Sequence, residues 1–157
     1  MQHSLFDTPK KREIYLQGGY LYYWSNFLDH DTALYLFEEL EQQLPWEQPS
    51  IKIAGKRIAI PRKQVWMGDN KTSYVYSGQR FEPLPWHPDL WQLKQTIQQV
   101  SGESFNSVLC NLYRDGQDSV AWHADDEPEL GEAPVIASYS LGAPRKFQMR
   151  LKGESKT

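Results

Sequence analysis

The chain has 157 residues, of which 39% are hydrophobic and 24% charged, and it contains ten glycines and ten prolines. This composition is typical of one globular domain and excludes a disordered tail or a repeat array. The formal net charge of −3 does not indicate nucleic-acid binding by itself, because such proteins usually carry a basic excess. No apolar run approaches the ~20 residues that cross a bilayer, and no apolar stretch near the N-terminus precedes a small-residue cleavage site, so we expect neither membrane contact nor secretion.

Two amphipathic helices are predicted in the N-terminal two thirds of the chain. Residues 32–44 carry apolar side chains at helical spacing, with Asp31 as the expected N-cap. Residues 88–100 repeat this pattern, with Pro88 in the first turn and Gly102 just beyond the end. We expect these two helices to buttress the rest of the domain.

Short strands are predicted between and after the helices. SIKIA and RIAIP flank Gly55-Lys56 and predict a basic β-hairpin, and QVWM and SYVYS continue as short strands. From Ser104 onward the helical period disappears and four strand-like runs follow: SFNSVLCNLY, SVAWHAD, PVIASYSL and RKFQMRL. This order predicts an α+β fold, and it favours a jelly roll as the arrangement of the strands. A jelly roll has about eight strands, so we expect its C-terminal strands to be missing from this chain.

Charge is segregated along the sequence. Residues 47–80 hold seven basic side chains against two acidic ones, whereas residues 115–132 hold seven acidic side chains and neither Lys nor Arg. Two interpretations stay open, either two sites of opposite chemistry or two solvated faces.

The acidic segment contains a candidate metal motif, His123-Ala124-Asp125. On a strand, residues i and i+2 share a face with Cα atoms roughly 6.5 Å apart, so both side chains can reach one ion. A histidine and a carboxylate are two of the three ligands of the 2-His-1-carboxylate set that binds non-haem Fe(II). His-X-Asp alone is a weak motif, and the alternative is a surface histidine beside solvated acids.

The sequence resembles the AlkB-like Fe(II)- and 2-oxoglutarate-dependent dioxygenases, which repair alkylated nucleobases. The resemblance rests on four blocks: PRKQVWMGD, SYVYSG, FNSVLCNLYRDGQDSVAWHADDE and IASYSLGAPRKFQMR. Their order and spacing are far more specific than His-X-Asp, and they span most of residues 58–152. The resemblance implies a double-stranded β-helix, a jelly-roll variant, with a nucleotide-recognition lid. We expect one partial dioxygenase domain over residues 1–157, with the helices, hairpin and lid in 1–103 and the first part of the β-helix in 104–157.

The resemblance also implies the site residues. His123 and Asp125 would bind Fe(II), while Asn111 and Tyr113 would hydrogen-bond 2-oxoglutarate. The iron centre would then oxidise an N-alkyl group, whose hydroxylated product is released as an aldehyde, leaving orientation and exclusion of water to the protein. The family's second iron-binding histidine and its cofactor-binding arginines have no match here, because His3, His30 and His87 all precede the motif. We therefore expect this chain by itself to be inactive.

Substrate contacts follow from the need to flip a base out of its stack. Tyr74 and Tyr76 match the aromatic lid residues of the family, although an ordinary strand face is an open alternative. Asp126 and Glu127 would contact an exocyclic nitrogen or balance the charge of a methylated base, unless they form a solvated turn. Phosphate contacts are expected from Arg57, Arg62, Lys63 and Arg145, with Arg150 as a further candidate.

Three functional hypotheses remain. The first is oxidative dealkylation of DNA or RNA bases with Fe(II), 2-oxoglutarate and O2 in the full-length protein, which we expect to be monomeric. The second is a nucleic-acid-binding fragment without turnover, and the third is a same-family hydroxylase of a protein or small molecule. Cys110 is the only cysteine, which favours a reducing intracellular location, either cytoplasmic (nucleoid) or nuclear.

Overall fold

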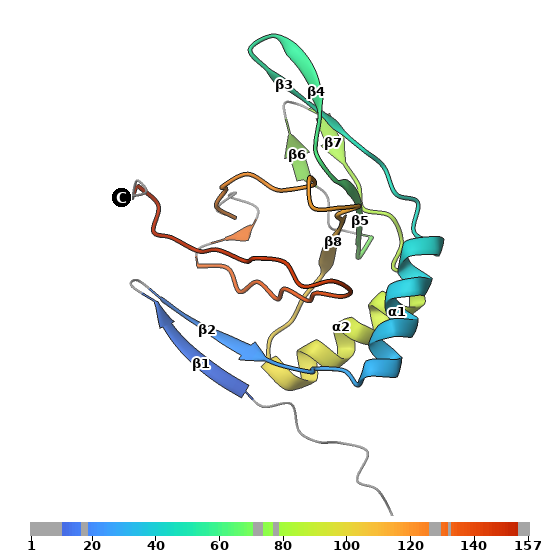
Figure 1. The fold of residues 1–157 in the computed structure, drawn as a ribbon, viewed down its shortest axis with the longest axis vertical. Coiled ribbons are helices and arrows are strands. Elements are labelled where there is room, and N and C mark those ends of the chain that lie inside the picture. The colour runs from blue at the N-terminus through green and yellow to red at the C-terminus, as the bar shows by residue number, and fades with distance from the viewer. Residues whose placement is uncertain are drawn as a thin grey trace, which may run out of the picture. The chain divides into compact units, whose positions relative to one another are not determined.

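The computed structural model describes residues 11–16, 19–70, 74–76, 79–125, 130–131 and 133–153. Within these ranges the elements follow the order β1 (Lys11–Leu16), β2 (Gly19–Trp24), α1 (His30–Gln43), β3 (Ser50–Ile53), β4 (Lys56–Ala59), β5 (Lys63–Gly68), β6 (Tyr74–Tyr76), β7 (Gln79–Phe81), α2 (Pro88–Ser101) and β8 (Ser107–Leu112) (Figure 1). The chain divides into two compact units, one formed by residues 1–39 with 139–157 and the other by residues 40–138. The described residues therefore contain both helices and antiparallel strand pairs, as the α+β prediction requires.

The first unit contains a β-hairpin that the sequence patterns did not reveal. Strands β1 and β2 pair antiparallel, with Leu16 opposite Gly19 and Lys11 opposite Trp24. Tyr20, Tyr22 and Trp24 alternate along β2, and their rings follow one another at centroid distances of 5.3 and 5.9 Å. The signal for this hairpin was a pair of runs rich in aromatic and β-branched residues around Gly18-Gly19.

Helix α1 begins at His30, two residues before the predicted start. Its N-cap is Asp29 rather than the expected Asp31, because the Asp29 carboxylate accepts hydrogen bonds from the Thr32 backbone N–H at 3.0 Å and the Thr32 hydroxyl at 2.6 Å. The predicted apolar face is confirmed at Leu36 and Leu40, which are buried. One face of α1 is therefore apolar, as the spacing in the sequence indicated.

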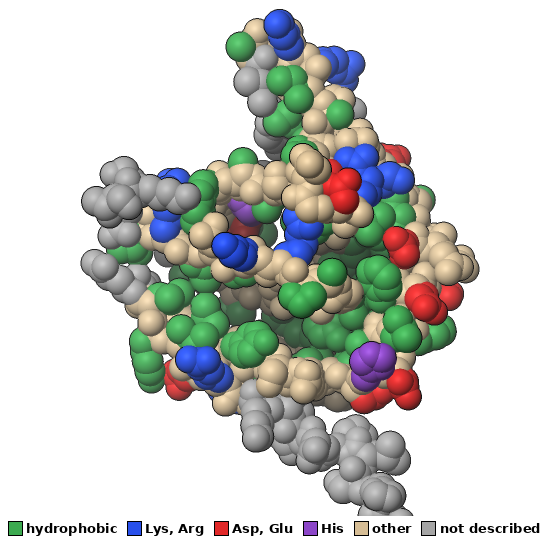
Figure 2. Space-filling view, in the orientation of Figure 1, with side chains coloured by type: hydrophobic (Ala, Val, Ile, Leu, Met, Phe, Trp, Pro, Cys, Tyr) green, Lys and Arg blue, Asp and Glu red, His purple; other side chains and the backbone are tan. Residues whose placement is uncertain are grey.

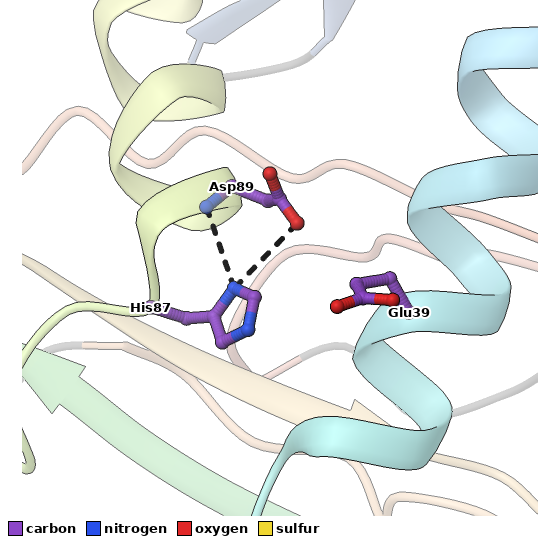
Figure 3. Close-up of side chains that lie close together, drawn as sticks. All are labelled: Glu39, His87 and Asp89. Carbon is purple, nitrogen blue, oxygen red and sulfur yellow. Dashed lines mark hydrogen bonds and ion pairs between the residues drawn. The ribbon is translucent and has the colours of Figure 1, made fainter.

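The second unit contains α2, whose predicted boundaries are closely confirmed. His87 caps the N-terminus, where its Nδ1 accepts the Asp89 backbone N–H at 3.3 Å and lies 3.8 Å from Asp89 Oδ2 (Figure 3). Gly102 ends the helix in the left-handed conformation, at φ 76°, and its N–H bonds the Gln98 carbonyl. His87 thus has a clear structural role at the start of α2.

In the described part of the second unit the strands form three antiparallel pairs, β3 with β4, β5 with β8 and β6 with β7. The β3–β4 pair projects as the predicted basic hairpin (Figure 1). Its two-residue turn is Ala54-Gly55, with φ of 47° and 82°, and positive φ at both central positions is the requirement of a type I′ turn. The β5–β8 pair places Gln64 opposite Asn111 and holds the buried side chains of Val65 and Met67.

Three of the four strand-like runs predicted after Ser104 are not strands in the described residues. SFNSVLCNLY contains β8, but residues 119–125, 134–141 and 145–151 have no assigned strand. An extended segment becomes a strand only when a neighbour supplies a hydrogen-bonding ladder, and the described residues provide no partner for these three. Phe147, Met149 and Val135 are accordingly exposed. No helix in the described part of the chain combines the length and apolar character needed to span a membrane.

Candidate functional site

His123 and Asp125 lie close together in the segment that follows β8. Their side chains are partly exposed, at 56% and 47%, and His123 Nε2 lies 3.7 Å from Asp125 Oδ1. Imidazole nitrogen and carboxylate oxygen bind a metal such as zinc at about 2.0–2.2 Å each, so two atoms at this separation can share one ion. The prediction that this pair lies on a strand is wrong, because residues 123–125 are irregular. The pair nevertheless converges through the local chain path.

The hydrogen bond at His123 Nδ1 determines which ring nitrogen could bind a metal. His123 Nδ1 lies 2.8 Å from the Ala121 carbonyl oxygen, which can only accept a hydrogen bond, so Nδ1 carries the proton. Nε2 is then the ring nitrogen that faces Asp125. Metal-binding histidines usually have this arrangement, in which the far ring nitrogen donates to a carbonyl or carboxylate.

A turn held by an ion pair connects β8 to the His123 segment. Arg114 Nε lies 2.7 Å from Asp118 Oδ2, and the Arg114 backbone N–H donates to the same oxygen at 2.9 Å. Asp118 is 4% exposed, and its carboxylate raises the pKa of Arg114 above the ordinary value of a guanidinium. The sequence reasoning missed this pair, for which the signal was an Arg and an Asp four residues apart around Gly116.

Asn111 and Tyr113, the predicted cofactor contacts, come from the end of β8. Asn111 is the second-last residue of the strand and Tyr113 follows it directly. Asn111 Oδ1 accepts a hydrogen bond from Arg62 Nε at 2.8 Å. The structure therefore brings together Asn111 and Arg62, to which the sequence assigned separate roles. Cys110 directly precedes Asn111 on β8. Burial raises the pKa of its thiol to about 11, so this cysteine stays protonated and serves packing.

The predicted base contacts are only partly described. The backbones of Tyr74 and Tyr76 form β6, which pairs with β7 so that Tyr74 is opposite Phe81. Their side chains lie outside the described part of the structure, as do Asp126 and Glu127 entirely. Their roles stay predictions.

The predicted phosphate contacts occupy different environments. Arg57 is exposed on the β3–β4 hairpin, where Lys52 and Lys56 are exposed as well, and Figure 2 shows basic side chains on this projection. Lys63 at the start of β5 and Arg62 before it are half-buried. Arg145 is exposed and belongs to the other compact unit. Among the basic side chains that the structure describes in the second unit, those of the hairpin are thus an accessible group.

A cluster around one buried lysine, Lys94, connects the two ends of the segment that contains β6 and β7. Lys94 on α2 is 8% exposed, and its ammonium lies 3.9 Å from the centroid of the Trp91 ring and 4.6 Å from that of Trp86. Asp69, directly after β5, accepts a hydrogen bond from Trp86 Nε1 at 2.7 Å and lies 3.5 Å from Lys94 Nζ. Asp69 precedes the β6–β7 hairpin and Trp86 follows it, so this cluster anchors the base of the predicted lid.

Comparison with known proteins identifies similar sequences over most of the chain. The family model described as 2OG-Fe(II) oxygenase superfamily matches residues 20–157. Alpha-ketoglutarate-dependent dioxygenase alkB homolog 3 from Rattus norvegicus is 46% identical over 130 residues, which is 82% of this chain and 43% of that protein. The Homo sapiens protein of the same name is 45% identical over 130 residues, covering 82% of this chain and 45% of its own length.

A second group of relatives carries another name. DNA oxidative demethylase ALKBH2 from Arabidopsis thaliana is 35% identical over an alignment of 159 residues. This alignment covers 98% of this chain and 51% of that protein. The chain thus spans about half, or less, of the length of the curated relatives it matches.

Proposed function

The chain belongs to the 2OG-Fe(II) oxygenase superfamily, and we propose that the whole protein oxidatively removes alkyl groups from nucleobases of DNA or RNA. Relatives at 40% and 35% identity are named DNA oxidative demethylase, which supports a nucleic-acid substrate over a protein or small molecule. The observation that carries the proposal within this chain is the His123–Asp125 pair, whose ligand atoms lie 3.7 Å apart.

The His123–Asp125 pair fits two of the ligands that Fe(II) takes in such enzymes. The hydrogen bond from Nδ1 to the Ala121 carbonyl leaves Nε2, which faces the carboxylate, as the ring nitrogen that would bind the metal. When bound, Fe(II) with 2-oxoglutarate and O2 supplies the oxidising power for the N-alkyl group. We propose that His123 and Asp125 hold the iron and that the Arg114–Asp118 turn fixes the path of the segment that carries them.

We assign 2-oxoglutarate to Asn111 and Tyr113. Both are polar, and both come from the end of β8, where a rigid strand fixes the backbone from which they extend. An amide N–H and a phenolic O–H can donate hydrogen bonds to carboxylate oxygens. Their proposed task is to orient the cofactor.

For the substrate, we propose that Tyr74 and Tyr76 stack against the flipped base. Asp126 and Glu127 would contact its polar edge or balance the charge of an alkylated base. The exposed β3–β4 hairpin, which carries Arg57 opposite Lys52, would contact phosphates together with Lys63, without reading sequence. Arg145 is a further phosphate contact under this proposal.

The turn of the hairpin supports a preference for unpaired substrate. Flipping a base from a duplex requires a side chain that fills the gap, at a cost of a few kcal/mol of unstacking. The exposed tip residue here is Ala54, and a methyl group cannot fill the space of a base. We therefore propose that the protein acts on single-stranded or distorted nucleic acid.

The superfamily supports a double-stranded β-helix for the complete domain. Under this proposal α1 and α2 buttress the sheets, β6–β7 forms the lid, and β8 with the residues after it begins the β-helix. We further propose an intracellular monomer, cytoplasmic or nuclear, because its substrate is nucleic acid.

The proposal is tested by incubating the whole protein with Fe(II), 2-oxoglutarate, O2 and an oligonucleotide that carries one N-methylated base. Mass spectrometry should show loss of the methyl group, with formaldehyde and succinate formed in equal amounts, and faster reaction on single strands than on matched duplexes. Binding of the oligonucleotide without methyl loss would favour a binding module without turnover. Equal or faster reaction on the duplex would contradict the strand preference.

A further inference from the structure

Arg62 lies in the connection between β4 and β5 and has two partners inside the second unit. Its backbone N–H bonds the Ile60 carbonyl at 2.9 Å, which forms a tight turn before β5. Its side chain is half-buried. Nε donates to Asn111 Oδ1 at 2.8 Å, and Nη1 lies 3.5 Å from the Ser119 carbonyl oxygen. The side chain therefore reaches both β8 and the segment that leads to His123.

The bond to Asn111 determines how the asparagine amide is oriented. A guanidinium carries only N–H donors, so the atom that faces Arg62 must be the amide oxygen. The two N–H bonds of the same amide then point elsewhere and are available as donors. A dicarboxylate can only accept hydrogen bonds when ionised, so this orientation is the one that suits 2-oxoglutarate.

Arg62 and its neighbour Pro61 also contact the backbone of Ser119, in the segment that leads to His123. The Ser119 backbone N–H donates to the Pro61 carbonyl at 2.8 Å, so residues 61 and 62 contact Ser119 through both its backbone groups. Asp118, next to Ser119, is fixed by Arg114 at 2.7 Å. The turn between β4 and β5 is thereby connected to the start of the segment that carries His123 and Asp125.

We propose that Arg62 is a positioning residue that orients the Asn111 amide with its N–H donors toward the cofactor and holds the start of the His123 segment, rather than a phosphate contact. The cofactor part of this inference rests on the proposed function, which assigns 2-oxoglutarate to Asn111. Arg57 provides the comparison, because it has the same charge but is exposed on β4.

Nuclear magnetic resonance of the side-chain amides tests the orientation directly, with the Asn111 signals assigned by their loss in Asn111→Asp. In Arg62→Gln these signals should shift, while Arg57→Gln should leave them in place. Arg62→Lys keeps the charge without the planar arrangement of donors, so it should also shift them. A second readout is the affinity for a single-stranded oligonucleotide as a function of salt. Arg57→Gln should lower the slope by about one, and Arg62→Gln should leave the slope unchanged.

Unchanged Asn111 signals in Arg62→Gln, or a loss of salt slope equal to that of Arg57→Gln, would overturn the positioning role. Titration of the wild type with 2-oxoglutarate and Zn(II) separates this inference from the proposed function. The Asn111 amide signals should shift on titration. If they respond to Arg62→Gln but not to 2-oxoglutarate, the Arg62 bond stands and the cofactor assignment is wrong.

Discussion

The Arg114 guanidinium binds both oxygens of the Asp118 carboxylate, with Nε to Oδ2 at 2.7 Å and Nη2 to Oδ1 at 2.8 Å. The two residues are four apart and enclose the turn at Gly116. Because one partner is buried and the other is half-exposed, the pair differs from an ordinary surface ion pair, whose contribution is small. It fixes the path of the chain from the proposed cofactor contacts on β8 to the proposed metal ligands.

Asp118→Asn should therefore destabilise the protein by about 2 kcal/mol, since hydrogen bonds to a charged group contribute about 1.5–3 kcal/mol. The measurement is the free energy of unfolding in urea. The control is Glu103→Gln, which changes an exposed carboxylate and should have an effect within about 0.5 kcal/mol. Equal effects of the two substitutions would show that the ion pair does not stabilise the turn.

Lys94→Ala should destabilise the second unit by about 2 kcal/mol, because it removes a buried cation from two tryptophan faces, each contact contributing about 0.5–2 kcal/mol. The side chain is 7% exposed and pairs with Asp69. Tryptophan fluorescence should also change, since Trp86 and Trp91 lose their shared neighbour. Lys52→Ala, on the exposed face of the hairpin, is the matched control. An emission spectrum and stability like those of wild type would contradict the cluster's proposed role.

The turn at the tip of the β3–β4 hairpin gives a pair of predictions of opposite sign. Ala54 has φ 47°, a conformation that costs a non-glycine residue about 1–2 kcal/mol, so Ala54→Gly should stabilise the protein by up to about 1 kcal/mol. Gly55 has φ 82° with no atom within 4 Å of an added Cβ, so Gly55→Ala should destabilise it through backbone strain alone. The midpoint of thermal unfolding measures both. The same sign for the two substitutions would be incompatible with a type I′ turn.

Asp29 gives a pH-dependent prediction. Hydrogen bonds from Thr32 lower the pKa of Asp29 below its ordinary value. A carboxylate whose pKa is lower in the folded state contributes stability that is present above the unfolded pKa of about 3.9 and is lost as the pH falls through the folded pKa. The cost of Asp29→Ala should thus be larger near neutral pH than below pH ~3, as measured by urea unfolding. Asp31→Ala, which removes no cap, should show a weaker pH dependence.

Periodicity in the sequence predicted the elements whose stability is local. The spacing of Leu36 and Leu40 was sufficient for α1, and Pro88 with Gly102 set the ends of α2, because helical hydrogen bonds and caps form within one segment. The runs that flank Gly55-Lys56 predicted a hairpin for the same reason, although its turn lies one residue earlier, at Ala54-Gly55. The strands expected at residues 134–141 and 145–151 depend on partners distant in the sequence, which a periodic pattern cannot supply.

In the candidate site, too, the sequence pattern identified residues that are close in the chain and missed contacts between residues that are far apart. His123 and Asp125 were found from a spacing of two residues, although the strand expected beneath them is absent from the described residues. The bond between Arg62 and Asn111 joins residues 49 apart, so no local pattern could indicate it. Asp69, Trp86 and Lys94 likewise meet only in the folded unit.

The metal site provides the most direct test of the central claim, that His123 and Asp125 hold the iron with which the protein dealkylates nucleobases. The measurement is the visible absorption of the whole protein titrated anaerobically with Fe(II) and 2-oxoglutarate. A charge-transfer band should form in the wild type and in Glu103→Gln, and it should be lost in Asp125→Ala. An undiminished band in Asp125→Ala, or no band in the wild type, would contradict the account.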